Sequence, residues 1–373
     1  MRPVRLGAHC VYSTNHFQGC VLCQAWDKTV EDVNPQHEPL FFVITTTYRA
    51  SPVIGRTFSS LLSQTKNNFV HYIYEDASDD PEFDQIVHEY MSKVSRLPNP
   101  YKVIYEKGTV NLGCDKAHEY VFRKVFGTHL IWLDQGDYVA KDFFAKMSSE
   151  VRRHPHSQWF HINCIHYDLK TGRTVGKADN RRFERSMLYR EDQLVPWTFG
   201  QFYYHLFVFS VPAFRDCFNK NVEIIDKKEH GGCFYDAQIV LRAIALQLRM
   251  HYVRPLLGFV MIDPSSVSTG YVGDAQMADR CIERILDGDE RFARFRSFYI
   301  PYKRLVRNAA KTHLLCAEKD GRKRATHNVD ELVRFLRNWD CPILRFYPDV
   351  WKHRLILFIA LVPGFRRLLR LAI

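Results

Sequence analysis

The sequence of 373 residues lacks an apolar stretch long enough to cross a membrane. Its C-terminal tail has only eight consecutive apolar residues, Leu355 to Val362, before Pro363, whereas a spanning helix needs about 20. The N-terminal residues Met1 to Leu6 lead into no apolar core of the kind that signal peptides have. We therefore expect a cytoplasmic protein rather than an integral membrane protein.

Paired metal-binding cysteines are also scarce, although the chain contains ten cysteines. In a chain of this size without a signal peptide, reduced thiols are expected rather than disulfides. Cys10, His16, Cys20 and Cys23 include a single C-x2-C pair. A structural zinc site usually needs two such ligand pairs. The spacing therefore favours a packed N-terminal extension over residues 1–38 rather than a zinc site.

Three common phosphate-binding or nucleophile motifs are missing: G-x-x-x-x-G-K-[ST], G-x-G-x-x-G and G-x-S-x-G. A nucleotidyltransferase would normally carry a glycine-rich, basic phosphate loop after its first strand. The segment Thr45 to Ala50 has no glycine. These absences disfavour that class.

Acidic residues are few in the C-terminal part of the chain. Residues 291–373 contain 19 Lys and Arg against six Asp and Glu, while the whole chain has a net charge of +11. A basic tail on a near-neutral body indicates a local anionic partner for the tail, such as a membrane surface. A nucleic-acid partner is not expected. Residues 351–373 fit an interfacial helix at the inner face of the membrane. A helix docked on the rest of the protein fits almost as well.

Apolar, β-branched runs alternate with helical patterns in the first half of the chain. This alternation favours an α/β fold with a doubly wound, mostly parallel sheet and helices on both faces. Strands are predicted at 40–46, 69–74, 101–105, 128–133, 158–164, 204–209, 251–254 and 258–262. Helices are predicted at 52–64, 82–95, 114–125, 235–249 and, mostly helical and basic, 291–319, with a long loop at 173–190.

Two acidic turns follow predicted strands directly. Glu75 to Asp80 follows the second strand, and Asp134 to Asp137 follows the fourth. Ligands of doubly wound sheets bind outside the carboxyl ends of the strands. The two turns together therefore predict a ligand site, whereas either turn alone reads as an ordinary solvated turn.

A series of segments resembles, in order, the motifs of family 2 glycosyltransferases. That family has a strand ending in a Pro-Thr-Tyr-Asn-type turn, a helix ending Ser-Leu-x-x-Gln-Thr, an Asp-Asp-Gly-Ser turn, an Asp-x-Asp-Asp metal motif and a Glu-Asp-x-Asp helix. The matching segments here are 39–49, 55–65, 73–78, 111–113, 130–137, 204–206, 234–242 and 255–268. The resemblance implies a GT-A-like fold and transfer of a sugar, with inversion, from a nucleotide diphosphate sugar to an acceptor hydroxyl.

The resemblance also implies roles for individual residues. Nucleotide-sugar binding is expected at Thr46, Thr47, Tyr48, Asp76, Asn111 and Asp134. Asp76 would contact the base ring. The catalytic base would be Asp236, at the start of its helix, and a helix cap is the simpler alternative for this residue. His205 is a weak candidate for the acceptor site, since a histidine in an apolar run is more often a core residue.

The expected metal is Mg²⁺ or Mn²⁺, held by Asp134, Asp137 and Asp263. Two positions depart from the family pattern: Gly136 replaces the second motif aspartate, and Asp263 replaces a histidine. Aspartate is a hard oxygen donor suited to these ions, so we expect a rebuilt site. Lys116 and His118 are expected to be surface residues.

The predicted organisation has three parts. An N-terminal extension (1–38) precedes a catalytic domain at 39–270, with a nucleotide-binding half (39–150) and an acceptor half (151–270). A helical basic region, 271–373, follows. We expect a glycosyltransferase of surface polysaccharide or glycolipid assembly that acts on a saccharide or lipid-linked acceptor. The alternative, favoured by Gly136, is a catalytically silent nucleotide-sugar-binding or scaffold protein.

Overall fold

The computed structural model describes residues 39–168, 171–177, 206–218, 235–246, 248–262 and 290. The predicted N-terminal extension with its cysteine cluster lies outside these residues. So do the basic tail at 351–373 and nearly all of the predicted region 271–373. Among the described residues, no helix is long and apolar enough to cross a membrane.

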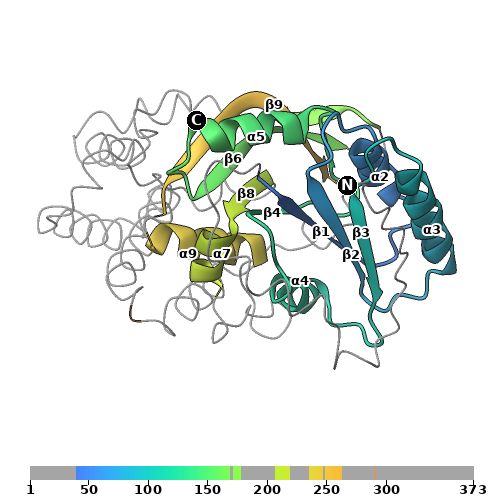
Figure 1. Ribbon diagram of the computed structural model, residues 1–373. Helices are drawn as coiled ribbons and strands as arrows, with labels where there is room; N and C mark the ends of the chain where they lie inside the picture. The colour runs from blue at the N-terminus through green and yellow to red at the C-terminus, as the bar shows by residue number, and fades with distance from the viewer. Residues whose placement is uncertain are drawn as a thin grey trace, which may run out of the picture. The chain divides into compact units, whose positions relative to one another are not determined.

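The described strands form one nine-stranded mixed sheet (Figure 1). They run β3-β2-β1-β4-β8-β6-β9-β5, with β7 beside β6. β1 to β4 are mutually parallel, whereas β8 is antiparallel to both of its neighbours, β4 and β6. The strands are β1 (Phe41–Thr47), β2 (Phe69–Glu75), β3 (Lys102–Lys107), β4 (His129–Trp132), β5 (Tyr138–Val139), β6 (Trp159–Asp168), β7 (Thr174–Lys177), β8 (Leu206–Ser210) and β9 (Met250–Ile262).

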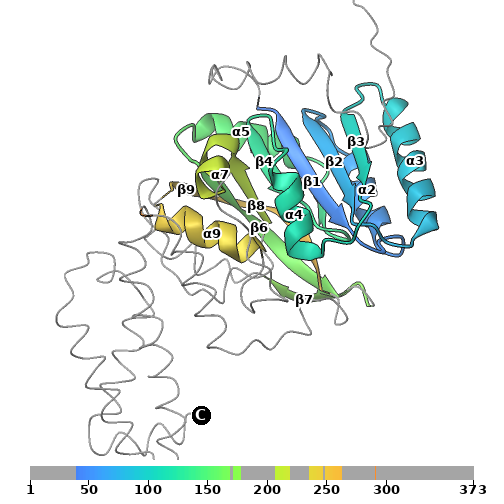
Figure 2. The same ribbon diagram turned by 90° about the horizontal axis from the view of Figure 1, so that it is seen from below.

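Helices cover both faces of the sheet (Figures 1 and 2). One face carries α2 (Ile54–Leu62), α3 (Pro81–Ser95) and α5 (Phe143–Arg153), and the other carries α4 (Cys114–Phe122) and α7 (Val211–Cys217). The predicted α/β architecture with helices on both faces is confirmed. A further helix, α9 (Tyr235–Ala245), belongs to a second compact unit of the chain.

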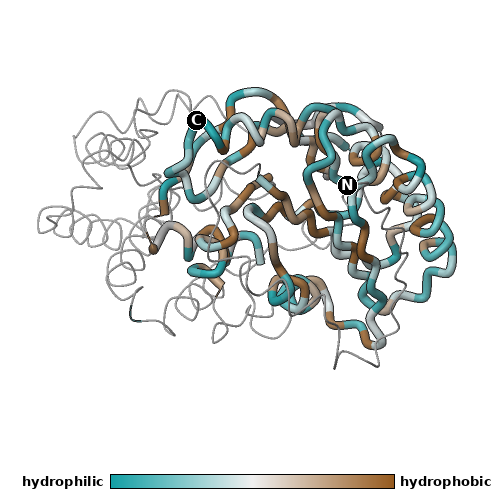
Figure 3. The backbone as a smooth tube through the Cα atoms, viewed as in Figure 1, coloured by the Kyte–Doolittle hydropathy of each residue, from teal (hydrophilic) through white to brown (hydrophobic). Residues whose placement is uncertain are grey.

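Every residue of β1 is buried, which explains its continuous apolar and threonine-rich sequence. On the α5 face, the ring of Phe144 stacks on Phe69 with centroids 4.2 Å apart. On the opposite face, Trp132 stacks on Phe209 at 5.6 Å. Figure 3 shows hydrophobic residues concentrated along these central strands. Burial on both faces makes β1 the rigid centre of the sheet.

Strand β9 is a single 13-residue strand, where the sequence predicted two short ones. The gap between the two predicted strands, residues 255–257, begins with Pro255, which cannot donate a backbone hydrogen bond. The pairing with β6 shifts register around Asn163. The side-chain amide of Asn163 donates to the carbonyl of Arg254 at 2.7 Å. This local bulge accommodates the proline without ending the strand.

Several elements of the structure were not predicted from the sequence. The predicted loop at 173–190 begins with strand β7, which pairs with β6, and its residues beyond Lys177 lie outside the described part of the chain. The two-residue β5 and the helices α5 and α7 were also not predicted. β7 has only four residues, too few for a clear alternation, although it pairs with the preceding strand β6. β5 pairs with the distant strand β9, so no local periodicity marks it.

A buried chain of hydrogen bonds crosses the sheet beneath the end of β1. The hydroxyl of Thr45 donates to the carbonyl of Leu133 at 2.8 Å, so its oxygen accepts from Nε2 of His71 at 3.0 Å. Nδ1 of His71 then accepts from the hydroxyl of Tyr90 at 2.9 Å, and Tyr90 accepts from Tyr101. Every member has its partner only while the imidazole is neutral. Burial accordingly lowers the pKa of His71 to about 3.

This burial predicts a loss of stability in mild acid. Below about pH 6.5 the unfolded chain binds a proton at His71, while the folded protein stays neutral there down to about pH 3. The free energy of unfolding should therefore decrease as the pH is lowered through this window. His71 contributes at most about 1.4 kcal/mol per pH unit to this decrease. Burial lowers the pKa of His129 to about 4, so it adds to the effect.

Urea denaturation at pH 7 and at pH 5 checks this, and the readout is the difference between the free energies of unfolding at the two pH values. His71→Gln should shrink that difference, whereas replacing the exposed His88 by Gln should leave it unchanged. An equal pH dependence in wild type and His71→Gln would show that this histidine is not held neutral by the fold.

Candidate functional site

The carboxyl end of β1 brings three predicted residues to one edge of the sheet, each with a different partner. The hydroxyl of Thr46 lies 2.7 Å from Nε2 of His118. The hydroxyl of Thr47 donates to the carbonyl of Tyr74 on β2 at 3.1 Å. Tyr48 is 41% exposed, and its backbone N–H donates to the side-chain oxygen of Gln135 at 2.9 Å. Only Tyr48 of the three offers much of its side chain to solvent.

Asp76, which follows β2, is only 4% exposed and organises the turn before α4. Its Oδ1 accepts from the backbone N–H of Leu112 and its Oδ2 from that of Gly113, both at 2.8 Å. The exposed Asn111 closes the same turn, because its Oδ1 also accepts from Gly113 at 2.9 Å. A carboxylate oxygen can accept more than one hydrogen bond. Asp76 can therefore hold this turn and still contact a ligand.

The acidic turn at 75–80 is buried at its start rather than solvated. Glu75 is 1% exposed, and its Oε1 accepts from the backbone N–H of Ser78 at 2.6 Å. Ala77 takes a left-handed φ of 50°, at the position where the resembling family has glycine. At the far end, Asp80 caps α3 and accepts from the hydroxyl of Ser51 at 2.6 Å. Internal hydrogen bonds and burial hold this turn in place, so it is not an ordinary solvated turn.

His118, on α4, corrects an expectation from the sequence. It was expected at the surface, but it is 2% exposed and joins the ends of β1 and β4. Nε2 lies 2.7 Å from the Thr46 hydroxyl and 3.3 Å from Oδ1 of Asp134, and Nδ1 donates to the carbonyl of Cys114 at 2.7 Å. No local pattern marks such a residue, because α4 is amphipathic only weakly and its partners lie 72 and 16 residues away.

The charge on His118 depends on Asp134. Burial disfavours the imidazolium, but the hydrogen bond to the carboxylate of Asp134 and the contact with Cys114 outweigh it and raise the pKa of His118 to about 10. The side chain of Asp134 is 49% exposed. One of its oxygens is thus tied to a buried cation while the group still faces solvent.

Asp134 to Asp137 form a tight turn after β4. The backbone N–H of Asp137 donates to the carbonyl of Asp134 at 3.0 Å. Between them, Gly136 has a φ of +93°, which favours glycine in the third position of a turn. A Cβ on Gly136 would lie 2.5 Å from the sulfur of Met261. The glycine that replaces the family's second aspartate is therefore favoured by the positive φ of the backbone, and a side chain there would also require the flexible end of Met261 to move.

Asp137 is held by the same strand, since its Oδ1 accepts from the backbone N–H of Met261 at 2.7 Å. Burial and the neighbouring charge of Asp134 raise the pKa of Asp137 well above its usual range, against the lowering effect of that N–H. Two carboxylates that repel each other are a donor set that a divalent cation would stabilise. The residues that are described therefore fit a hard cation.

Of the other predicted site residues, one lies in the second compact unit and two lie outside the described residues. Asp236 lies in the first turn of α9, partly buried, in the second compact unit. Asp263 comes directly after the end of β9 and lies outside the described residues, as does His205. Of the described residues, only Glu150, His154 and His251 bring three potential metal ligands together.

Residues 42–218, just under half of the chain, match the family described as glycosyl transferase family 2. Among curated proteins, no match to the chain is found.

Many solved structures resemble the chain, among them TarS 1–349 of S. aureus in complex with UDP-GlcNAc. That structure has a TM-score of 0.50 and 16% identity, and the alignment covers 84% of this chain and 87% of that chain. This likeness shows that the present chain has the GT-A fold. A second TarS 1–349 structure has a TM-score of 0.47 and 18% identity, over 67% of this chain and 66% of that one.

GalNAc-T7, in a structure with UDP, GalNAc and Mn²⁺, has a TM-score of 0.45 and 14% identity. Its alignment covers 69% of this chain and 49% of that chain, so this chain spans about half the length of GalNAc-T7.

The turn geometry predicts that alanine at position 136 will destabilise the protein. Gly136→Ala places a side chain at positive φ and against Met261, which should lower the free energy of unfolding by about 1–3 kcal/mol. Gly55→Ala is the matched control, because a Cβ there meets open space on the exposed side of α2. It should raise stability by roughly 0.5–1 kcal/mol. Chemical denaturation of both variants checks the pair, and equal effects at the two positions would contradict the described turn.

Proposed function

We propose that this chain, whose residues 42–218 belong to glycosyl transferase family 2, moves a sugar from a nucleotide diphosphate sugar to an acceptor hydroxyl with inversion. One observation carries the proposal. Thr46 is at the carboxyl end of β1, and Asp76 and Asp134 follow its parallel neighbours β2 and β4, so all three lie at one edge of the sheet. Parallel α/β sheets bind their ligands there, and all three residues fall within the matched segment.

The nucleoside would bind between the ends of β1 and β2. Asp76 holds the turn at 111–113 with both oxygens and has capacity left for a base N–H. Tyr48 offers an exposed ring beside it. The hydroxyls of Thr46 and Thr47 are already engaged by His118 and Tyr74. We assign those threonines to shaping the pocket wall.

A divalent cation, Mg²⁺ or Mn²⁺, would be held by Asp134, Asp137 and Asp263. When bound, it would stabilise negative charge that builds up on the departing diphosphate. On the protein side, the Met261 N–H fixes one oxygen of Asp137 and His118 orients one oxygen of Asp134. These two contacts orient the carboxylates of Asp137 and Asp134, and Gly136 leaves no third carboxylate inside the turn.

Asp236 is proposed as the general base that removes the proton of the acceptor hydroxyl. One base acting on one displacement gives inversion at the anomeric carbon. His205 would lie on the acceptor side. The basic region from residue 291 would bring the enzyme to an anionic membrane surface, where a lipid-linked or saccharide acceptor of surface polysaccharide or glycolipid assembly is available.

A catalytically silent nucleotide-sugar-binding protein is the second candidate, and Gly136 is the observation that favours it. Such a protein would keep the nucleoside contacts of Asp76 but would transfer no sugar. The two functions therefore differ in the chemical step and not in nucleotide binding.

Asp76 should be needed for nucleotide binding. UDP is the first probe, because the resembling TarS structure contains UDP-GlcNAc. Asp76→Asn turns one acceptor into a donor that faces the backbone N–H groups of Leu112 and Gly113. UDP affinity should fall by about ten- to a hundredfold, as for loss of a charged hydrogen bond of about 1.5–3 kcal/mol. Calorimetry checks this, with Asp216→Asn on the exposed side of α7 as the matched control. Equal UDP affinity of wild type and Asp76→Asn would remove Asp76 from the site.

Asp236→Asn should separate a base from a helix cap. The amide cannot accept the proton of the hydroxyl, so sugar transfer should fall at least about a hundredfold while UDP affinity and melting temperature stay unchanged. Asparagine caps a helix about as well as aspartate, so a capping role predicts full activity. Transfer rate, UDP affinity and melting temperature are measured on the same preparation. Undiminished transfer would rule out Asp236 as the base.

A further inference from the structure

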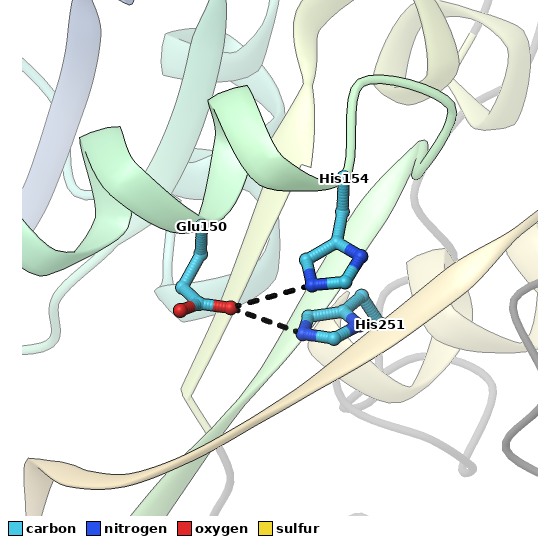
Figure 4. Close-up of side chains that lie close together, drawn as sticks. All are labelled: Glu150, His154 and His251. Carbon is cyan, nitrogen blue, oxygen red and sulfur yellow. Dashed lines mark hydrogen bonds and ion pairs between the residues drawn. The ribbon is translucent and has the colours of Figure 1, made fainter.

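A second cluster of potential ligands lies away from the proposed nucleotide edge (Figure 4). Glu150 is on α5, His154 is the C-cap of that helix, and His251 is the second residue of β9. β9 is parallel to β6, and β6 and β4 are each antiparallel to β8 between them. β9 therefore starts at the sheet end opposite to the carboxyl end of β4. Met261, which contacts Asp137, is ten residues further along β9, a span of about 30 Å.

Local structure brings the three side chains together. Glu150 and His154 are four residues apart at the end of a helix, so they lie on one face. His251 pairs with Phe160 on β6, and Phe160 is part of the core that α5 covers. Figure 4 shows both imidazoles beside the carboxylate of Glu150. The helix end and the strand start thus present their ligand atoms to the same point.

Two of the three distances between ligand atoms are close to those expected around a tetrahedral ion, and all three atoms lie within 4.8 Å of one another. Oε2 of Glu150 lies 3.2 Å from Nε2 of His251 and 3.7 Å from Nε2 of His154. Ligand atoms that are each about 2.0–2.1 Å from a tetrahedral zinc ion lie roughly 3.3–3.4 Å apart. The other oxygen of Glu150 is paired with Arg153, which leaves Oε2 directed at the two rings.

The environment also suits a bound ion. The side chains of Glu150, His154 and His251 are 15%, 14% and 20% exposed. They are therefore largely withdrawn from water while an ion can still reach them. The imidazole rings stack with centroids 3.6 Å apart and planes inclined by 22°. An ion between the two Nε2 atoms would require the rings to splay so that their lone pairs converge.

We propose that Glu150, His154 and His251 form a binding site for a divalent transition-metal ion of the zinc type. Two imidazoles and one carboxylate are borderline ligands that favour zinc over magnesium or calcium. A fourth position would remain for water. The ion would fasten the end of α5 to the start of β9, the strand that positions Asp137 at its other end. This proposal is independent of the proposed function.

The test uses the full chain, stripped of metal with a chelator and titrated with Zn²⁺ by calorimetry. Wild type should bind one equivalent of Zn²⁺ at this site. His251→Ala or Glu150→Gln should weaken the affinity for that equivalent by at least about tenfold. Zn²⁺ should also raise the melting temperature of wild type but not of these variants. His156→Ala, an exposed histidine two residues beyond His154, is the matched control and should behave as wild type.

Cobalt distinguishes this site from the chain's cysteines. Co²⁺ at a His-His-Glu site gives only weak visible bands, whereas a thiolate ligand adds a strong charge-transfer band in the near ultraviolet. The proposal expects a weak-band spectrum that His154→Gln abolishes, and a Cys20→Ser/Cys23→Ser variant should retain it. Should His251→Ala fail to fold, His154→Gln and Glu150→Gln provide the same comparison. Zinc binding that these variants leave unchanged, or that disappears only with the cysteines, would overturn the proposal.

Discussion

The site depends on the parallel pairing of β1 with β2 on one side and with β4 on the other. In register, Thr46 stands beside Tyr74, and Ile44 stands beside Trp132. The turns that follow β2 and β4 therefore open at the same edge of the sheet. Had either neighbour been antiparallel, Asp76 and Asp134 would lie at opposite ends. The burial of β1 on both faces holds this pairing, because a slip of one residue would exchange the side chains between the two packed faces and disrupt both.

Side chains that were not expected to matter support the acidic groups at this edge. His118 joins β1, α4 and β4, and it sets the charge environment of Asp134. Met261 holds Asp137 through a backbone N–H, and the end of its side chain lies against position 136. The departure of Gly136 from the family motif therefore has a backbone cause, its positive φ. It is not by itself a sign that the site has been lost.

Much of the first half of the fold could be predicted from sequence because its signals are local. Buried strands such as β1 are continuous apolar runs, and α3 begins at an aspartate cap followed by proline. The position of His118 could not be predicted, since its burial depends on strands distant in sequence. The continuity of β9 also depends on a distant pairing partner, β6. The proposed Glu150–His154–His251 cluster joins residues about 100 positions apart, and only the fold brings them together.

The central claim is that this edge of the sheet binds and activates a nucleotide sugar. A panel of nucleotide diphosphate sugars, beginning with UDP-GlcNAc, tests it most directly when release of the nucleoside diphosphate is followed with and without Mn²⁺. We expect one donor to be turned over faster than the rest, with slow hydrolysis when no acceptor is present and faster release with Mn²⁺. No binding and no release from any donor, with or without the metal, would contradict the account.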